Sequence, residues 1–153
     1  MTDNVQISRI LDKELINLSL KAKTKDEVIR ELTDMLYKAN YISDKEGYIQ
    51  DVYLRESEGV TGIGNNVAIP HVKSDSVYRA SVAIGRTEQT IDWESYDDKP
   101  VNLFFLFAIP SGIEGAKVHL KLLSQVASKL ANDKLLNKLK KAESAEEFIR
   151  LLG

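Results

Sequence analysis

The apolar residues of this chain switch between the spacing of strands and the spacing of helices. Residues Ile16–Leu20 show the strict alternation that is typical of a strand with one buried face. From Val28 to Ala39, apolar residues recur three and four positions apart, which predicts a helix with one face on the core. Thr24 and Glu27 form a capping box just before this run and predict where the helix begins.

The same signals predict four further helices. A second capping box, Ser43 to Glu46, opens a helix that extends to about Glu58 and carries Arg55. Glycines mark a loop before a long helix, and two short apolar repeats indicate closing helices, the last opened by a capping box at 144–147. These three helices are expected at residues 116–131, around 135–139 and around 148–152.

Three more apolar segments, at residues 67–69, 81–85 and 101–109, read as strands. The run Val101–Ile109 is almost continuously apolar, as expected for a central strand that is covered on both faces. Pro70 cannot donate to a sheet ladder, so we expect strand pairing to end there. The chain is therefore predicted to be an α/β sandwich, with a mixed sheet flanked by helices on both faces, in one domain of residues 1–153. This architecture alone implies no function.

Composition excludes several classes of function. The chain has 21 basic and 23 acidic residues, and this balance points to no nucleic acid and no anionic membrane surface. Cysteine is absent, which excludes disulfides, thiol catalysis and cysteine-based metal sites. The longest apolar run, Leu103–Ile109, is far too short to span a bilayer, and the first residues lack the pattern of a secretory signal. We therefore expect a cytoplasmic protein with no direct membrane insertion.

The segment from Thr61 to His71 carries the strongest chemical signal. Glycines and asparagines lead into a short apolar strand that stops at Pro70, and His71, one of two histidines, follows directly. Stiff backbone at a strand end holds the ring in place, and imidazole titrates near neutral pH, so the position suits a nucleophile or an acid–base group. Judged by its position alone, the alternative is that His71 is an ordinary surface histidine with no chemical role.

Three segments around this histidine form a longer pattern: Leu54-Arg55-Glu56, Thr61-Gly62-Ile63-Gly64 and Ala68-Ile69-Pro70-His71. This pattern resembles the enzyme IIA components of the bacterial phosphoenolpyruvate-dependent sugar phosphotransferase system, fructose/mannitol type (EIIA type 2). The likeness continues through residues 91–93, 98–101 and 119–127, so it covers nearly the whole chain.

The resemblance implies a role for each of three residues. His71 would accept a phosphoryl group as tele-phosphohistidine, Arg55 would stabilise the phosphate with its planar guanidinium, and His119 would support His71. Without the resemblance, Arg55 reads as a solvated helix residue paired with Asp51 or Glu58, and His119 as a packed histidine on an apolar helix face.

Residues 61–66, between Arg55 and His71, are candidates for a phosphate-binding loop. Glycines allow backbone amides to converge on an anion, and a threonine hydroxyl can add a further donor. Taken alone, a Gly-x-Gly sequence indicates only an ordinary turn. Relatives usually carry glycine where Asn66 and Val72 stand, and asparagine tolerates the left-handed backbone well enough to keep the loop shape. The candidate loop residues are Thr61, Gly62, Gly64 and Asn66.

The resemblance also implies partners. His71 would receive the phosphoryl group from the carrier HPr and pass it to a cysteine of a cognate enzyme IIB for sugar uptake, with no metal or other cofactor. One alternative is a nitrogen-type regulatory IIA protein, in which phosphorylation of His71 controls binding to target proteins. Another is a non-catalytic binding module that has kept the fold.

Other site chemistries are less well supported by the sequence. A metal site would need both histidines and an acid such as Glu56 or Glu58, yet no His-x-x-x-His motif is present. No P-loop or Rossmann fingerprint indicates a nucleotide site, and no Gly-x-Ser-x-Gly elbow indicates a serine hydrolase.

Overall fold

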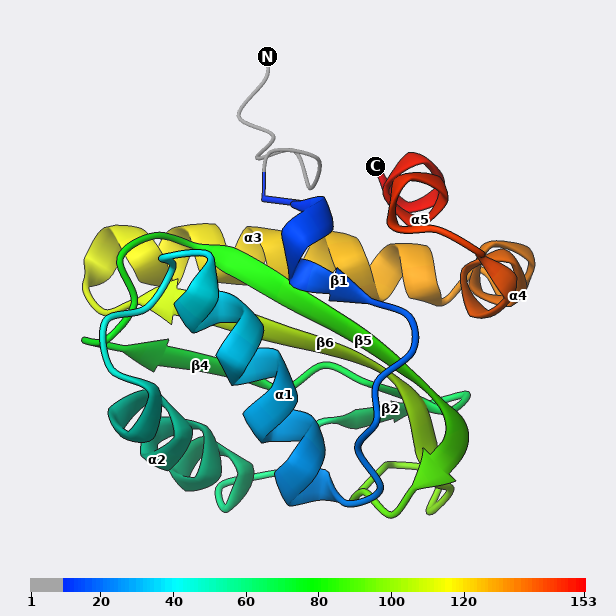
Figure 1. Ribbon diagram of the computed structural model, residues 1–153, viewed down its shortest axis with the longest axis horizontal. Coiled ribbons are helices and arrows are strands. Elements are labelled where there is room, and N and C mark those ends of the chain that lie inside the picture. Colours follow the sequence, from blue (N-terminus) through cyan, green and yellow to red (C-terminus); the bar gives the residue numbers. More distant parts are fainter. Residues whose placement is uncertain (1–9) are drawn as a thin grey trace.

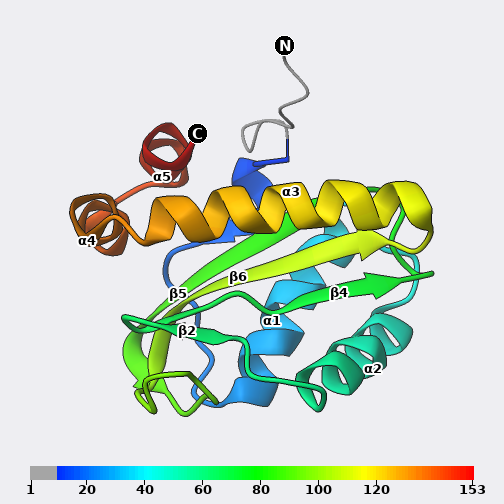
Figure 2. The same cartoon turned by 180° about the vertical axis from the view of Figure 1, so that it is seen from behind.

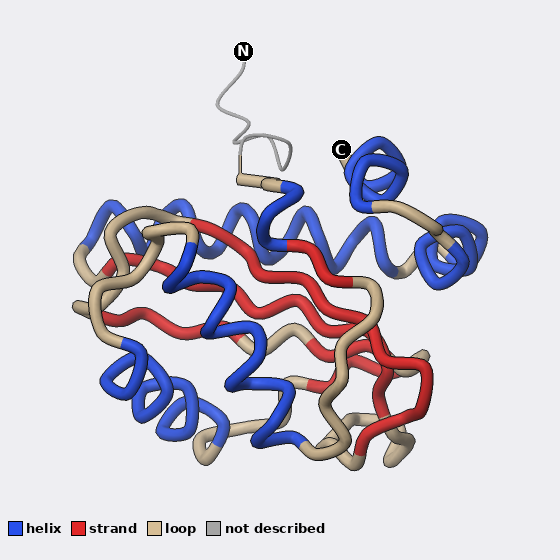
Figure 3. The backbone as a smooth tube through the Cα atoms, in the orientation of Figure 1, coloured by secondary structure: helices blue, strands red, loops and turns tan. Residues whose placement is uncertain are grey.

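The computed structural model describes residues 10–153, without the side chains of residues 113–116 and 118–120. Its centre is a six-stranded mixed sheet (Figure 3). Five strands follow one another across it in the order β1 (Ile16–Asn17), β5 (Ser81–Ile91), β6 (Val101–Pro110), β3 (Val67–Ala68) and β2 (Gly62–Gly64). The sixth strand, β4 (His71–Ser74), pairs with β6 in the same direction as β3 does.

Helices cover both faces of the sheet. Helices α1 (Lys25–Lys38) and α2 (Lys45–Glu56) lie in front of the sheet in Figure 1. Seen from behind, α3 (Ile113–Leu130) crosses the other face, and α4 (Asp133–Lys141) and α5 (Ala145–Leu152) follow it (Figure 2). A short 3-10 helix, Lys13–Leu15, precedes β1. The predicted α/β sandwich with a mixed sheet is confirmed.

Strand β6 divides the core into two layers. Successive side chains of a strand point to opposite faces, so its continuous apolar run supplies both. Phe104, Leu106 and Ala108 pack with α1 and α2, whereas Phe105 and Phe107 pack with the helices of the opposite face. All five are fully buried. Aromatic contact joins β6 to the last helix, with the Phe105 and Phe148 ring centroids 6.0 Å apart.

Local capping sets the helix starts. Thr24 accepts a hydrogen bond from the amide of Glu27 at 3.1 Å, so the first predicted capping box opens α1. The second prediction was displaced by one residue, because Asp44 caps α2 through the amide of Gly47 while Ser43 donates to the carbonyl of Ser76. Helix α2 also ends at Glu56, two residues earlier than expected, and α3 begins at Ile113 instead of Ala116.

The sequence did not predict strand β4. Strand β3 ends at Ala68, but the carbonyl of Pro70 accepts a hydrogen bond from the amide of Phe107 at 2.8 Å. Proline lacks a donor but keeps its acceptor, so the chain stays beside β6 and pairing resumes at once, with His71 opposite Phe107. His71 therefore begins a strand instead of following one.

Gly85 allows β5 to approach the segment after β1 and helix α1. A Cβ at this position would collide with Leu20 and would lie 2.9 Å from Cδ2 of Leu32. Overpacking of a filled core costs about 1–3 kcal/mol, so we expect Gly85→Ala to lower the free energy of unfolding by that amount in urea titrations.

Gly59→Ala is the matched control, because the added Cβ would meet only Nη1 of Arg55, at an ordinary 3.7 Å. Its free energy of unfolding should stay within about 0.5 kcal/mol of the unsubstituted protein. Equal stability of the two variants would contradict the close packing at Gly85.

Candidate functional site

The structure brings Arg55 and His71 together. Arg55 lies in the last turn of α2, and His71 is the half-buried first residue of β4, on which α2 packs. Nη2 of Arg55 lies 3.0 Å from Nε2 of His71, and Nδ1 of His71 lies 2.8 Å from the carbonyl oxygen of Ile69. Among the described residues no ion pair joins Arg55 to Asp51 or Glu58, the partners that a plain surface arginine would have.

These two contacts assign the tautomer of the ring. A carbonyl oxygen only accepts hydrogen bonds, so Nδ1 of His71 carries the proton and donates it to Ile69. A guanidinium only donates, so Nε2 presents its lone pair to Arg55. The nitrogen that can act as a nucleophile is therefore Nε2, and it faces the cation.

The surroundings of His71 keep its ring neutral. Burial lowers the pKa of His71, the hydrogen bond to the Ile69 carbonyl raises it, and the charge of Arg55 lowers it again, against a smaller opposing effect of Glu56. The net result is a pKa below the ordinary histidine value, so the ring holds an unprotonated Nε2 at neutral pH.

The ring lies in the wall of an open pocket of about 290 Å³. Its lining combines cationic, acidic and apolar side chains from the end of α2 and the start of β4: Asp51, Leu54, Arg55, Glu58, His71, Val72 and Lys73. Leu54 is 63% exposed, which leaves a large apolar side chain at the edge of the site. Such a rim can contact another macromolecule.

Thr61 belongs to a buried hydrogen-bond network that the sequence did not reveal. The indole nitrogen of Trp93 donates to Oγ1 of Thr61 at 3.0 Å, and the Thr61 hydroxyl donates to Oε1 of Glu56 at 3.0 Å. Nζ of Lys25 lies 2.8 Å from the same Oε1, and also 2.8 Å from Oε1 of Glu94. The side chain of Glu56 is only 6% exposed, so these partners stabilise a carboxylate that burial would otherwise penalise.

This network fixes the end of α2. Burial opposes the charge of Lys25, but its hydrogen bonds to Glu56 and Glu94 outweigh that effect and raise its pKa. The ammonium also lies 4.8 Å from the ring centroid of Trp93, a cation–π contact. Because Glu56 follows Arg55 directly, anchoring Glu56 to Lys25 of α1 and to Thr61 also holds the guanidinium in position beside His71.

The predicted phosphate-binding loop is a β-hairpin. Strand β2 pairs with β3, and residues 65 and 66 form the turn, with φ of 56° and 68°. The expected left-handed backbone at Asn66 is therefore confirmed. Its side chain donates to the carbonyl of Pro100 at 3.0 Å and accepts from Lys140 at 3.3 Å.

Protein groups already use the Gly62 amide and the Thr61 hydroxyl, so the predicted convergence of the loop donors on a phosphate stays a prediction. The amide of Gly62 donates to the carbonyl of Glu94 at 3.0 Å, and the Thr61 hydroxyl donates to Glu56. A Cβ on Gly62 would lie 2.6 Å from both the Glu94 carbonyl and Cβ of Ser95. The glycine signal thus marks a close backbone approach, but the group that approaches is another loop of the protein. Gly64, at the far end of β2, also keeps a positive φ of 97°.

The predicted role of His119 stays a prediction, because its side chain lies outside the described residues. Within the part of the chain that the structure describes, no three His, Cys, Asp or Glu side chains gather closely enough to hold a metal ion. No helix there is both long and apolar enough to cross a membrane.

Comparisons with known proteins agree with the predicted resemblance. A family model described as "Phosphoenolpyruvate-dependent sugar phosphotransferase system, EIIA 2" matches residues 9–153. The fructose-specific EIIA component of Haloferax volcanii is 35% identical over 144 residues, which cover 94% of this chain and 92% of that protein. The fructose-specific EIIABC component of Bacillus subtilis is 34% identical over 149 residues, 97% of this chain but only 23% of that longer protein.

A solved structure shows the same fold. The nitrogen regulatory protein IIA-Ntr from Neisseria meningitidis matches with a TM-score of 0.87 and 30% sequence identity, over 96% of this chain and 99% of that one. The relatives with 30% to 35% sequence identity thus include both fructose-specific and nitrogen regulatory proteins.

We expect the titration of His71 to reveal its neutral ring. By heteronuclear NMR its midpoint should lie below about 6.5, with the proton on Nδ1 above that pH. Arg55→Ala should move the midpoint upward, because it removes a neighbouring positive charge. The unfolded chain binds the proton more tightly, so the free energy of unfolding should fall as pH drops below about 6.5 through the lowered pKa. A midpoint above the ordinary histidine value would contradict the lowered pKa and the neutral ring.

The network around Thr61 should contribute measurably to stability. Thr61→Val leaves Trp93 Nε1 without its acceptor and takes one donor from Glu56, so the free energy of unfolding should drop by about 1–3 kcal/mol. Thr90→Val, at an exposed position of β5, is the control and should change it by less than about 0.5 kcal/mol. The absence of any difference between the two variants would show that the network is not stabilising.

Proposed function

Because the chain belongs to the phosphoenolpyruvate-dependent sugar phosphotransferase system EIIA 2 family, we propose that it carries a phosphoryl group on Nε2 of His71. The single observation that most supports this is the orientation of the ring. Its Nδ1 is held by the Ile69 carbonyl, and its lone pair at Nε2 points to the Arg55 guanidinium. A cation at that position would meet the oxygens of a phosphoryl group on Nε2.

The transfer needs no proton movement on His71. The lone pair of Nε2 attacks phosphorus as the bond between phosphorus and the donor breaks, and that electron pair returns to the donor. The ring then carries a positive charge, which the carbonyl of Ile69 stabilises through Nδ1–H. When an acceptor attacks phosphorus in turn, the Nε2–phosphorus bond breaks, its electron pair returns to Nε2, and the neutral ring is restored.

Arg55 changes partner during this cycle. In the unphosphorylated protein it donates to Nε2. Once Nε2 is bonded to phosphorus, the guanidinium can donate two hydrogen bonds to phosphate oxygens, which its planar shape suits. It also neutralises charge that spreads over these oxygens in the transition state. The buried network at Glu56 limits how far the end of α2 can move during this exchange.

The proposed donor is the phosphohistidine of HPr, and the proposed acceptor is a cysteine of a cognate enzyme IIB that serves sugar uptake, with the exchange taking place in the cytoplasm. Either partner must bring its reacting atom to an open pocket, and exposed apolar side chains at the site support brief docking. Leu54 is 63% exposed and Val60 is 37% exposed. Such contacts suit small, transient interfaces.

A regulatory function is the second candidate. The 30% identity and TM-score of 0.87 to the nitrogen regulatory protein from Neisseria meningitidis favour it specifically. In that case phosphorylation of His71 would control binding to a target protein, with the same chemistry at the ring. A binding module without phosphoryl transfer is disfavoured by the paired Arg55 and His71.

Phosphorylation with phosphoenolpyruvate, enzyme I and HPr tests the proposal, with the acid-labile phosphate followed by mass spectrometry. His71→Ala should abolish labelling and leave the circular dichroism spectrum unchanged. Arg55→Ala should slow labelling by about 10²–10³-fold, the usual effect of losing one transition-state contact. Arg30→Ala removes an exposed arginine of α1 and should label at the normal rate.

His119→Ala should slow labelling without abolishing it. If His119→Ala alone blocked labelling and His71→Ala did not, the roles of the two histidines would be reversed. Normal labelling of Arg55→Ala would remove the arginine from the proposed mechanism.

A further inference from the structure

Two polar contacts join helix α2 to strand β4, which lie side by side in both ribbon views (Figures 1 and 2). One is the contact between Nη2 of Arg55 and Nε2 of His71. The other, one helical turn earlier, is a hydrogen bond of 2.6 Å from Oγ of Ser74 to Oδ2 of Asp51. The proposed phosphoryl transfer uses the first contact and leaves the second without a role.

Asp51 and Arg55 have the spacing of an ion pair but do not form one. They are four positions apart on α2, where an acid and a following base are neighbours on the helix surface. Both line the His71 pocket. On α1 the same spacing does give an ion pair, because Nε of Arg30 lies 3.0 Å from Oδ2 of Asp26. The ion pairs of the described residues include none between Asp51 and Arg55, so another contact must hold these two side chains apart.

Ser74 holds the carboxylate of Asp51 against β4. It is the last residue of the strand and is only 3% exposed. Its Oγ accepts a hydrogen bond from the amide of Ser76 at 3.1 Å, which leaves the hydroxyl proton to be donated to Asp51. A length of 2.6 Å is typical of a charge-assisted bond between a hydroxyl and a carboxylate. Such a bond is stronger than an ion pair at a helix surface, so Asp51 stays with Ser74.

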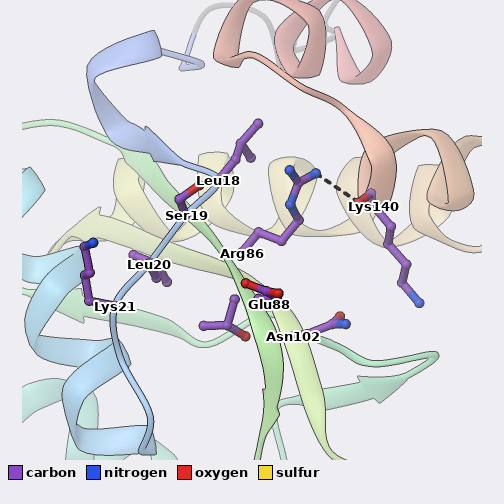
Figure 4. Close-up of a pocket in the computed structure, with 9 residues that line it drawn as sticks. Leu18, Ser19, Leu20, Lys21, Arg86, Glu88, Asn102 and Lys140 are labelled. Atoms are coloured by element: carbon purple, nitrogen blue, oxygen red, sulfur yellow. Dashed lines mark hydrogen bonds between the residues drawn. The ribbon is translucent and has the colours of Figure 1, made fainter.

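Arg55 lacks the backbone contacts that fix another arginine of this protein. Nη1 of Arg86 donates to two backbone carbonyls of α4, each at 3.0 Å, and Figure 4 shows this side chain directed at α4. The guanidinium of Arg55 has one hydrogen-bond partner among the described residues, Nε2 of His71. A guanidinium binds a carboxylate more strongly than a neutral ring nitrogen. Without its bond to β4, Asp51 would therefore draw Arg55 away from the ring.

Two other carboxylates lie close to Arg55 along the chain, but neither has the position of Asp51. Glu56 is buried, and its carboxylate is bonded within the network at the end of α2. Glu58 lies beyond the last residue of α2, at an exposed position, so it lacks the helical spacing. Asp51 is therefore the carboxylate that competes with the ring for Arg55.

We propose that Ser74 positions Arg55 for phosphoryl transfer. By binding Asp51, the Ser74 hydroxyl prevents an ion pair between Asp51 and Arg55 and so keeps the guanidinium at Nε2 of His71. This inference rests on the proposed function, because the guanidinium serves transfer only if Nε2 carries the phosphoryl group. Ser74 acts through Arg55, so it is a positioning residue and takes no direct part in the reaction.

Labelling with phosphoenolpyruvate, enzyme I and HPr measures the effect on transfer. Ser74→Ala should slow the labelling of His71 about tenfold, less than the loss of the guanidinium itself. In an Asp51→Asn background the same substitution should change the rate less than about twofold, because an amide cannot form the competing ion pair. Ser81→Ala is the control and should label at the normal rate, since it removes a buried serine hydroxyl of β5 that has no partner among the described residues.

The titration of His71 in the unphosphorylated protein tests the inference without any transfer. An ion pair between Asp51 and Arg55 would take positive charge away from Nε2, so Ser74→Ala should raise the NMR midpoint of His71. In the Asp51→Asn background, Ser74→Ala should leave the midpoint where Asp51→Asn alone puts it. The other charged residues of the pocket, Glu58 and Lys73, are the same in every variant.

The outcomes separate this inference from the proposed function. Normal labelling and an unchanged midpoint for Ser74→Ala would overturn the role of Ser74. Slower labelling that persists in the Asp51→Asn background would overturn it too, because it would show an effect of packing and not of competition for Arg55. If the unsubstituted protein itself is not labelled on His71, the proposed function fails. The midpoint would then still support the competition if Ser74→Ala raises it, and overturn it if not.

Discussion

The hydrogen bond from Nδ1 of His71 to the carbonyl of Ile69 determines the chemistry available at this site. It holds the proton on one ring nitrogen and leaves the lone pair on the other. The bond exists because Pro70 separates the two residues while the chain remains beside β6. The amide of Ile69 is itself bonded to the carbonyl of Thr61 at 2.9 Å, so the β2–β3 hairpin holds the acceptor of this bond in place.

The second requirement is a cation at Nε2, and the end of α2 supplies it. The position of Arg55 is restrained, because the next residue, Glu56, is buried and bonded to Thr61 and Lys25. Thr61 therefore links the two halves of the site. Its carbonyl supports Ile69 and its hydroxyl supports Glu56, so one residue helps to position both the ring and the guanidinium.

Most of the architecture could be predicted from the sequence, because its apolar spacing is regular. The continuous apolar run of β6 correctly indicated a strand covered on both faces, and the pairing of Arg55 with His71 followed from the resemblance. The hairpin at Gly62 was missed. A glycine indicates that another group approaches the backbone closely, but the sequence does not show which group this is; here it is the backbone of Glu94. Strand β4 was missed because proline was expected to end pairing, although its carbonyl still accepts. The link between Thr61 and Trp93 joins residues 32 positions apart, and no local pattern encodes it.

The most direct test of this mechanism is the position of the phosphate on the ring. After phosphorylation with phosphoenolpyruvate, enzyme I and HPr, phosphorus–nitrogen couplings measured by NMR identify the modified nitrogen. The tautomer set by Ile69 predicts a single phosphate on Nε2 of His71, with Nδ1 still protonated. A phosphate on Nδ1, or none on His71 in the presence of competent partners, would contradict it.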